Sequence, residues 1–203
     1  MKPRAIARSV PPIPSRAKNA LLFASVLLAG FSAACTMAKP LPMYGEVPRF
    51  QLTAQTGKPF DSRLLEGKVW VADFVFTNCP GPCPMMSQRM RQVQDLTAKL
   101  PNVRLVSFTV DPARDTPPVL AEYARHFQAQ PGRWFFLTGP QPALDALGFQ
   151  DFKLNHVDGS FLHSTRFALV DGRGRIRGYY RFTDDDMVQQ VVSGVRQLSK
   201  EPT

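Results

Sequence analysis

The stretch that decides the fold runs from Val69 to Met86 and reads VWVADFVFTNCPGPCPMM. Its first nine residues are mostly β-branched or aromatic, which is typical of a central strand buried on both faces. A loop rich in glycine and proline follows, and it contains Cys79 and Cys83 with three residues between them. Apolar residues then recur at helical spacing, which predicts a helix over about 84–99. The two thiols therefore lie where a buried strand ends and a helix begins, a common location for sites in α/β proteins.

The alternation of strands and helices continues on both sides of this stretch. Residues 50–60 predict an opening hairpin, and 171–174 (DGRG) is a turn signal between two further strands. The other predicted strands are 103–110, 134–137, 167–170 and 176–180, and the other predicted helices are 118–127, 143–147 and 188–198. Thr183 and Asp186 resemble a capping box before the last helix. The order predicts an α/β domain with a thioredoxin-like central sheet flanked by helices and an N-terminal β-hairpin.

The N-terminal segment resembles a secretory signal. Residues 1–34 contain five basic residues, no acidic residue and an apolar run over 20–34 that ends in small residues before Cys35. Three outcomes stay open: cleavage after Ala34, acylation of Cys35 as in lipoproteins, or an uncleaved membrane anchor. We expect a signal or anchor over 1–34, an unstructured linker over 35–48 and a folded domain over 49–200. The expected location is the periplasmic side of the inner membrane, or the periplasm if the segment is only cleaved, and both are oxidising spaces.

The composition excludes several classes of protein. With 203 residues, 44% of them hydrophobic, the chain can form one ordinary domain plus an appendage. The net charge of +9 includes the five N-terminal basic residues, and without them 20 basic residues face 16 acidic ones. The one basic cluster comprises Arg173, Arg175, Arg177 and Arg181, and we interpret it as a solvated face rather than a nucleic-acid site. Three cysteines are too few for a disulfide-rich scaffold.

The two thiols of the loop have several possible roles. They can close a structural disulfide, exchange one with a partner or bind a soft metal ion. Cys83 lies at the predicted helix start, where free N–H groups and the helix dipole favour a thiolate. A structural disulfide is the less favoured interpretation, because a strand-to-helix loop rich in glycine and proline rarely needs a covalent cross-link for its stability.

Among the histidines, His163 is the candidate metal ligand. It lies just before the predicted strand 167–170, in a loop that a thioredoxin-like sheet places beside the cysteine loop. We interpret His126 as a surface or packing residue and His156 as solvated. Two thiolates and one imidazole suit Cu(I), whereas zinc prefers a fourth ligand and Cu(II) would need an oxygen or water. Helical spacing places Met86 in the core and leaves the role of Met85 open.

These motifs as a set resemble the SCO/SenC copper-chaperone family. The resemblance rests on the cysteine motif CPGPCP over 79–84, on VDPARDTP over 110–117 and on His163-Ser164, and it covers about residues 44–198. It implies a thioredoxin-like fold, a membrane tether through the N-terminus and copper bound by Cys79, Cys83 and His163. Asp111 matches an acidic family position near the site, which implies that it orients the ligands, and a turn or capping role is an equal alternative.

The resemblance also implies a function. The protein would deliver copper to the binuclear copper site of cytochrome c oxidase during assembly, or keep the cysteines of that site reduced. The implied partners are the copper-site subunit of the oxidase and other periplasmic copper chaperones or thiol reductases, with no nucleic acid.

A thiol-disulfide oxidoreductase or thiol peroxidase using Cys79 and Cys83 is the alternative function. Enzymes of the thioredoxin type resemble one another in a cis-proline opposite the cysteines, and no proline occurs here from Ala143 to Glu201. A peroxiredoxin would have Thr-x-x-Cys, whereas Thr77 is two residues before Cys79. The sequence therefore favours a metallochaperone over an enzyme, although both activities can coexist in one dithiol.

Overall fold

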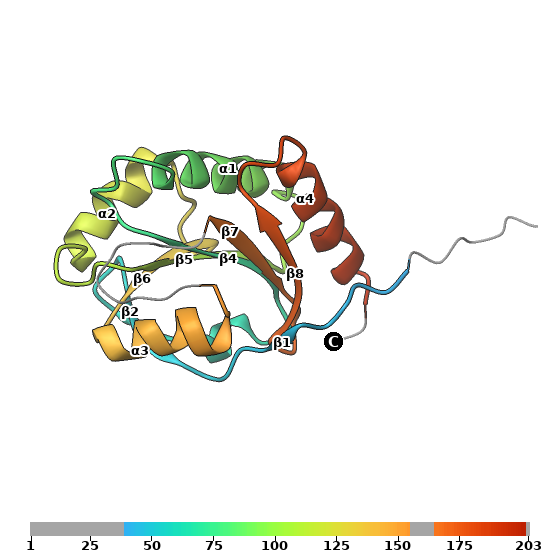
Figure 1. Ribbon diagram of the computed structural model, residues 1–203, viewed down its shortest axis with the longest axis horizontal. Helices are drawn as coiled ribbons and strands as arrows, with labels where there is room; N and C mark the ends of the chain where they lie inside the picture. Colours follow the sequence, from blue (N-terminus) through green and yellow to red (C-terminus); the bar gives the residue numbers. More distant parts are fainter. Residues whose placement is uncertain (1–38, 155–164, 202–203) are drawn as a thin grey trace, which may run out of the picture. The chain divides into compact units, whose positions relative to one another are not determined.

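The computed structural model describes residues 39–154 and 165–201, and its centre is one mixed sheet (Figure 1). The strands are β1 Gly45–Glu46, β2 Gln51–Ala54, β3 Pro59–Asp61, β4 Val69–Val75, β5 Val103–Thr109, β6 Trp134–Thr138, β7 Arg166–Val170 and β8 Arg175–Arg181. The helices are η1 Ser62–Leu65 (a 3₁₀ turn), α1 Cys83–Leu96, α2 Pro117–His126, α3 Gln141–Asp145, η2 Ala146–Asp151 (a π turn) and α4 Met187–Leu198. Among these described elements, none is a helix long and apolar enough to cross a bilayer.

The strand directions determine where the cysteine loop lies. The order across the sheet is β1-β8-β7-β4-β5-β6-β2-β3. Strand β4 is parallel to β5, β5 is parallel to β6, and β7 runs antiparallel to β4 on its other side. The carboxyl ends of β4, β5 and β6 therefore share one edge of the sheet, and the cysteine loop leaves from that edge. The turn between β7 and β8 lies at the opposite edge.

Two hydrophobic cores fill the two faces of the sheet. Helices α1, α2 and α4 cover one face, and α3 with η2 covers the other (Figure 1). Alternate residues of β4 point to opposite faces, so Val71 packs beneath the three helices while Trp70 and Phe74 pack toward α3. Phe152 is fully buried and contacts the rings of Trp70 and Phe74, which attaches η2 to the sheet.

The predicted thioredoxin-like α/β fold is confirmed, with small shifts of the element ends. The predicted capping box is wrong. Helix α4 begins only at Met187, so Thr183 lies before the helix and Asp186 takes the N-cap position. Asp186 makes no side-chain capping bond, and its backbone (φ −94°, ψ 9°) is not in the extended conformation of a typical N-cap. The apolar face predicted for this helix is present, since Val188, Val191 and Val195 are buried.

The expected linker differs from the structure in its described part. Residues 39–48 lie along β8 and α4, and β1 pairs with the start of β8. Arg177 donates hydrogen bonds to the carbonyl oxygens of Leu41 (2.8 Å) and Pro42 (3.0 Å), and Gln197 donates to that of Lys39 (2.8 Å). These partners are more than 130 residues away in sequence, so local sequence patterns do not predict the docking.

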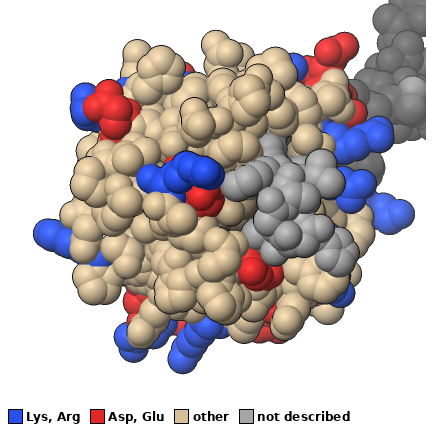
Figure 2. Space-filling view, turned by 60° about the vertical axis from the view of Figure 1, so that its left-hand side comes forward, with Lys and Arg blue, Asp and Glu red and all other residues tan. Residues whose placement is uncertain are grey.

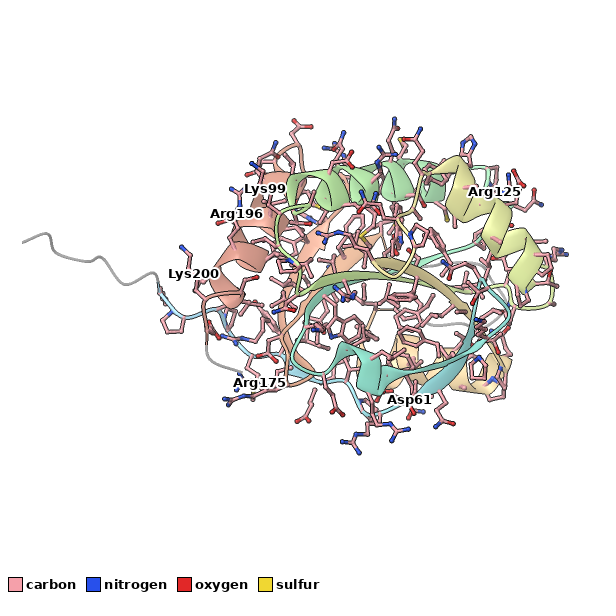
Figure 3. The ribbon with its side chains drawn as sticks, turned by 180° about the vertical axis from the view of Figure 1, so that it is seen from behind. Asp61, Lys99, Arg125, Arg175, Arg196 and Lys200 are labelled. Carbon is pink, nitrogen blue, oxygen red and sulfur yellow. The ribbon has the colours of Figure 1, made fainter. Side chains whose placement is uncertain are left out.

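The basic cluster is only partly the solvated face that we expected. The Arg177 side chain is 7% exposed and pairs with Asp171 (2.9 Å) and Glu201 (2.9 Å), and Arg175 also pairs with Asp171. In Figure 3, Lys99, Arg196 and Lys200 lie on the same side of the molecule as Arg175, whereas Arg125 lies on the opposite side. The buried Arg177 is committed to internal ion pairs and is not part of a solvated face.

Candidate metal centre

The two cysteines lie on the loop from β4 to α1, as predicted. Cys83 is the first residue of α1, and Pro82 and Pro84 flank it. Proline suits the first turn of a helix because N–H groups there have no intrahelical partner. The side of the molecule that carries the loop from β4 to α1 faces the viewer in Figure 2, and few charged side chains are visible on it.

The two thiols are not joined by a disulfide and lie in contact with each other. Cys79 and Cys83 form no disulfide, and a hydrogen bond joins their side chains. The backbone N–H of Gly81 approaches the Cys79 sulfur at 3.4 Å, and the backbone of Phe76 hydrogen-bonds to Cys83. Cys83 is fully buried whereas Cys79 is half-buried. The loop thus presents one accessible sulfur with a second directly beneath it.

The expected thiolate at Cys83 is not supported. Burial, followed by the hydrogen bond that the Cys83 thiol donates to Cys79, holds the pKa of Cys83 well above its usual range. The favourable field of a helix N-terminus is worth about 1 kcal/mol, which is less than the cost of desolvating a charge inside the protein. Cys83 therefore remains a protonated thiol in the free protein, and a soft metal ion that binds it must displace the proton.

Polar side chains that the sequence analysis did not single out lie in the core near the thiols. Asp73 is fully buried on β4, and its carboxyl, when ionised, adds to the burial that raises the pKa values of Cys83 and of Tyr123 on α2. The hydroxyl groups of Tyr123 and Ser87 lie 3.0 Å apart. The one sequence signal for this group was a lone aspartate inside the apolar run of β4.

Asp111 and Asp115 lie on the loop after β5, in the second motif of the sequence. Asp111 is buried and forms an ion pair with Arg114 at 2.8 Å, and its backbone N–H donates to Thr109. This is the geometry of a turn stabilised by its own side chains. Asp115 instead receives hydrogen bonds from Thr77, just before the cysteine motif.

The remaining predicted site residues lie outside the described residues. These are His163, His156 and Cys35, so the proposed third ligand and the lipidation candidate stay predictions. His126 is exposed and its ring contacts Phe127, as expected of a surface residue. Met86 is buried in the core as predicted, and Met85 is 53% exposed. Over 39–154 and 165–201, no three His, Cys, Asp or Glu side chains converge on one point.

The fold and the paired thiols define this chain as a thioredoxin-like dithiol protein. Two sulfurs in contact are suited to a soft metal ion or to reversible oxidation. The family model described as SCO1/SenC matches residues 40–199. The chain therefore belongs to the SCO1/SenC family, and the resemblance drawn from the sequence is confirmed.

Individual relatives agree with this assignment. The chain is similar to a SCO1 protein homolog of Bacillus subtilis, at 33% identity over 164 residues, covering 78% of this chain and 85% of that protein. It is also similar to the structure of BsSco, described as a member of the Sco family of cytochrome c oxidase assembly proteins with a disulfide switch. That match has 30% identity and a TM-score of 0.69, and it covers 81% of this chain and all of the other. Yeast Sco1 with copper bound matches at 27% identity and a TM-score of 0.60, covering 76% and 94% of the two chains.

Proposed function

We propose that this protein is a copper metallochaperone that delivers copper to the binuclear copper site of cytochrome c oxidase, or keeps the cysteines of that site reduced. The observation that carries the proposal is the contact between two thiols, not joined by a disulfide, at the β4–α1 loop. The relatives support it, because one is a Sco protein with copper bound and another belongs to a family of oxidase assembly proteins. Copper is the cargo here, so the protein must bind it reversibly.

The proposed ligands are Cys79, Cys83 and His163. Thiolate and imidazole are the donors that soft copper prefers, and three of them satisfy Cu(I). The partial exposure of Cys79 leaves one side of the pair open to a partner, while Cys83 lies beneath it. The copper-site subunit of the oxidase is the proposed recipient, and periplasmic copper chaperones or thiol reductases are the proposed sources of metal and electrons.

The test is a Cu(I) titration of the reduced full chain carrying Cys35→Ser, with a chromophoric competitor. We expect one copper per chain, loss of tight binding in Cys79→Ser and Cys83→Ser, and weaker binding in His163→Ala. The matched control is His126→Ala, which removes an exposed imidazole of α2. If His163→Ala behaves like His126→Ala, the three-ligand site is wrong.

A thiol-disulfide oxidoreductase is the competing function, and it is not favoured. Fast exchange enzymes attack with an accessible thiol, and Cys79 would have to serve as that thiol here, because Cys83 is fully buried and burial raises its pKa. Such enzymes resemble one another in a cis-proline opposite the thiols, and the sequence has no proline from Ala143 to Glu201. Rapid metal-free reduction of insulin disulfides by the protein would favour the oxidoreductase instead.

We also propose that the domain works at the periplasmic side of the inner membrane, held by its N-terminal segment. The support is the order of charge, apolar run and small residues before Cys35. Mass spectrometry of the mature N-terminus distinguishes acylated Cys35, cleavage after Ala34 and an uncleaved anchor.

A further inference from the structure

The Asp115 carboxylate links the cysteine loop to the neighbouring strand. Asp115 is 1% exposed and lies on the loop after β5. Its Oδ1 accepts a hydrogen bond from the Thr77 hydroxyl at 2.6 Å, and its Oδ2 accepts one from the Thr109 hydroxyl at 2.5 Å. The Thr77 backbone N–H also points at the carboxylate, 3.3 Å from Oδ1 and 3.2 Å from Oδ2.

These bonds act on the segment that carries Cys79. Thr77 lies two residues past the end of β4 and two residues before Cys79, and residues 77–78 form a turn. Thr77 donates through both its hydroxyl and its backbone, so the carboxylate fixes the direction of the main chain as well as one side chain. Hydrogen bonds to an ionised acceptor are short and strong, and burial strengthens them further.

The second residue that donates to Asp115, Thr109, is also held firmly in place. Thr109 is the last residue of β5, which pairs with β4 along its whole length. The Thr109 hydroxyl also accepts a hydrogen bond from the Asp111 N–H at 2.9 Å, and the Asp115 N–H donates to the Asp111 carbonyl at 2.9 Å. The carboxylate therefore joins the turn before Cys79 to a rigid part of the sheet.

We propose that Asp115 is a positioning residue, which holds the Thr77–Asn78 turn and thereby keeps the Cys79 sulfur against the Cys83 sulfur. Cys83 is fixed independently by burial at the start of α1. Only the Cys79 side of the pair then needs a support of its own. This inference rests on the proposed function only in taking the two thiols as the working site. It also gives the 110–117 motif of this chain a structural role, because Asp115 belongs to that motif.

The experiment measures how readily the two thiols close a disulfide, because that equilibrium reports their mutual position without any metal. The full chain carrying Cys35→Ser is equilibrated with reduced and oxidised glutathione, then alkylated and analysed by mass spectrometry. Thr77→Val removes the hydroxyl at nearly constant shape, and Thr77→Ser keeps it. We expect Thr77→Val to lower the equilibrium constant for disulfide closure about tenfold, the order of one hydrogen bond to a charged group, and Thr77→Ser to stay within about twofold of the parent.

The matched control is Thr97→Val at the end of α1. Thr97 is fully buried, whereas Thr77 is half-buried, and the Thr97 hydroxyl donates to the Val93 carbonyl at 2.7 Å. It lies at the other end of the helix from Cys83, so this variant loses stability while its disulfide equilibrium stays that of the parent. Equal shifts in Thr77→Val and Thr97→Val, or no shift in Thr77→Val, would overturn the proposal. Asp115→Asn serves as a second variant if Thr77→Val does not fold, with a shift in the same direction expected.

Copper titration of the same variants separates this inference from the proposed function. If the parent binds no copper while the disulfide shift is present, the chaperone function fails and the positioning role stands. If the parent binds copper and the disulfide equilibrium is unchanged in Thr77→Val and Asp115→Asn, the positioning role fails alone.

Discussion

The Ser107 hydroxyl donates a 2.6 Å hydrogen bond to Oδ1 of Asp73, whereas Oδ2 of the same carboxyl is buried without a hydrogen-bond partner among the described residues. Ser107 also accepts a hydrogen bond from the Trp134 indole at 3.0 Å. Burial raises the pKa of Asp73 to about 7, and the bond from Ser107 offsets only part of that effect. A carboxyl with one unpaired oxygen in a hydrophobic core is most stable in its neutral form.

This carboxyl should make stability fall as the pH rises toward neutrality. Between about pH 4 and 7 the unfolded chain has lost the Asp73 proton and the native state still holds it, which lowers the free energy of unfolding by about 1.4 kcal/mol per pH unit. Above pH 7 both states are ionised and the contribution is constant. Asp73→Asn should remove this slope, giving a variant close to the parent at pH 4 and more stable at pH 8. Urea unfolding across this range measures the effect, and parallel pH profiles for the two proteins would contradict it.

The two thiols should react at different rates. Because Cys83 is fully buried and its pKa is raised, we expect iodoacetamide to modify Cys79 first and Cys83 at least about tenfold more slowly. Mass spectrometry of the reduced Cys35→Ser chain follows both reactions. In Cys79→Ser, Cys83 should become reactive only in denaturant. Equal rates in the native protein would show that the contact between the sulfurs is not maintained in solution.

Much of the fold was predictable because its signals are local. The β-branched and aromatic runs located β4 and β5, and helical spacing located α1 and α4. Strand β1 was missed because Gly45–Glu46 has no strand pattern, and its pairing depends on β8 and Arg177, which come far later in the chain. Alternation assigns a residue to a face of a strand, but it cannot identify the side chains on the helices that pack there.

The location of the two cysteines could be predicted from the sequence, whereas the protonation state of Cys83 could not. The place of Cys79 and Cys83 follows from the boundary between a strand and a helix. The protonation of Cys83 does not, because the helix dipole is visible in the sequence whereas the burial that outweighs it arises from packing. The bridge between Thr77 and Asp115 joins residues 38 positions apart, and only the parallel pairing of β4 and β5 brings them together.

Replacing the neighbouring methionines Met85 and Met86 should change stability by very different amounts. Met86 is fully buried, so Met86→Ala should cost about 2–5 kcal/mol of stability by leaving a cavity. Met85 is 53% exposed, so Met85→Ala should change stability by less than about 0.5 kcal/mol. Urea unfolding checks both values. A Cu(I) titration of Met85→Ala, expected to match the parent, checks that the exposed thioether is not a ligand, and a weaker affinity would make it one.

Arg177 should be necessary for the docking of residues 39–48. Arg177→Leu leaves Asp171 without its buried partner and removes both bonds to Leu41 and Pro42, so a loss of about 3–5 kcal/mol is expected. Limited proteolysis should then cut the released segment ahead of the rest of the domain.

The matched control for that variant is Arg175→Gln. Arg175 also pairs with Asp171, but its side chain is more exposed and has no described bond to residues 39–48. The segment should stay protected in Arg175→Gln. If proteolysis cuts both variants alike, the docking depends on the charge of the cluster rather than on the Arg177 guanidinium.

The docking of residues 39–48 also determines which contacts would bear a force applied to the chain before Lys39. The chain enters the domain beside α4 and β8, at the edge of the sheet opposite the cysteine loop. A pull on the chain upstream of Lys39 would be borne by the Arg177 hydrogen bonds and by the pairing of β1 with β8. The thiols lie at the other end of the sheet, so that load would not pass through them.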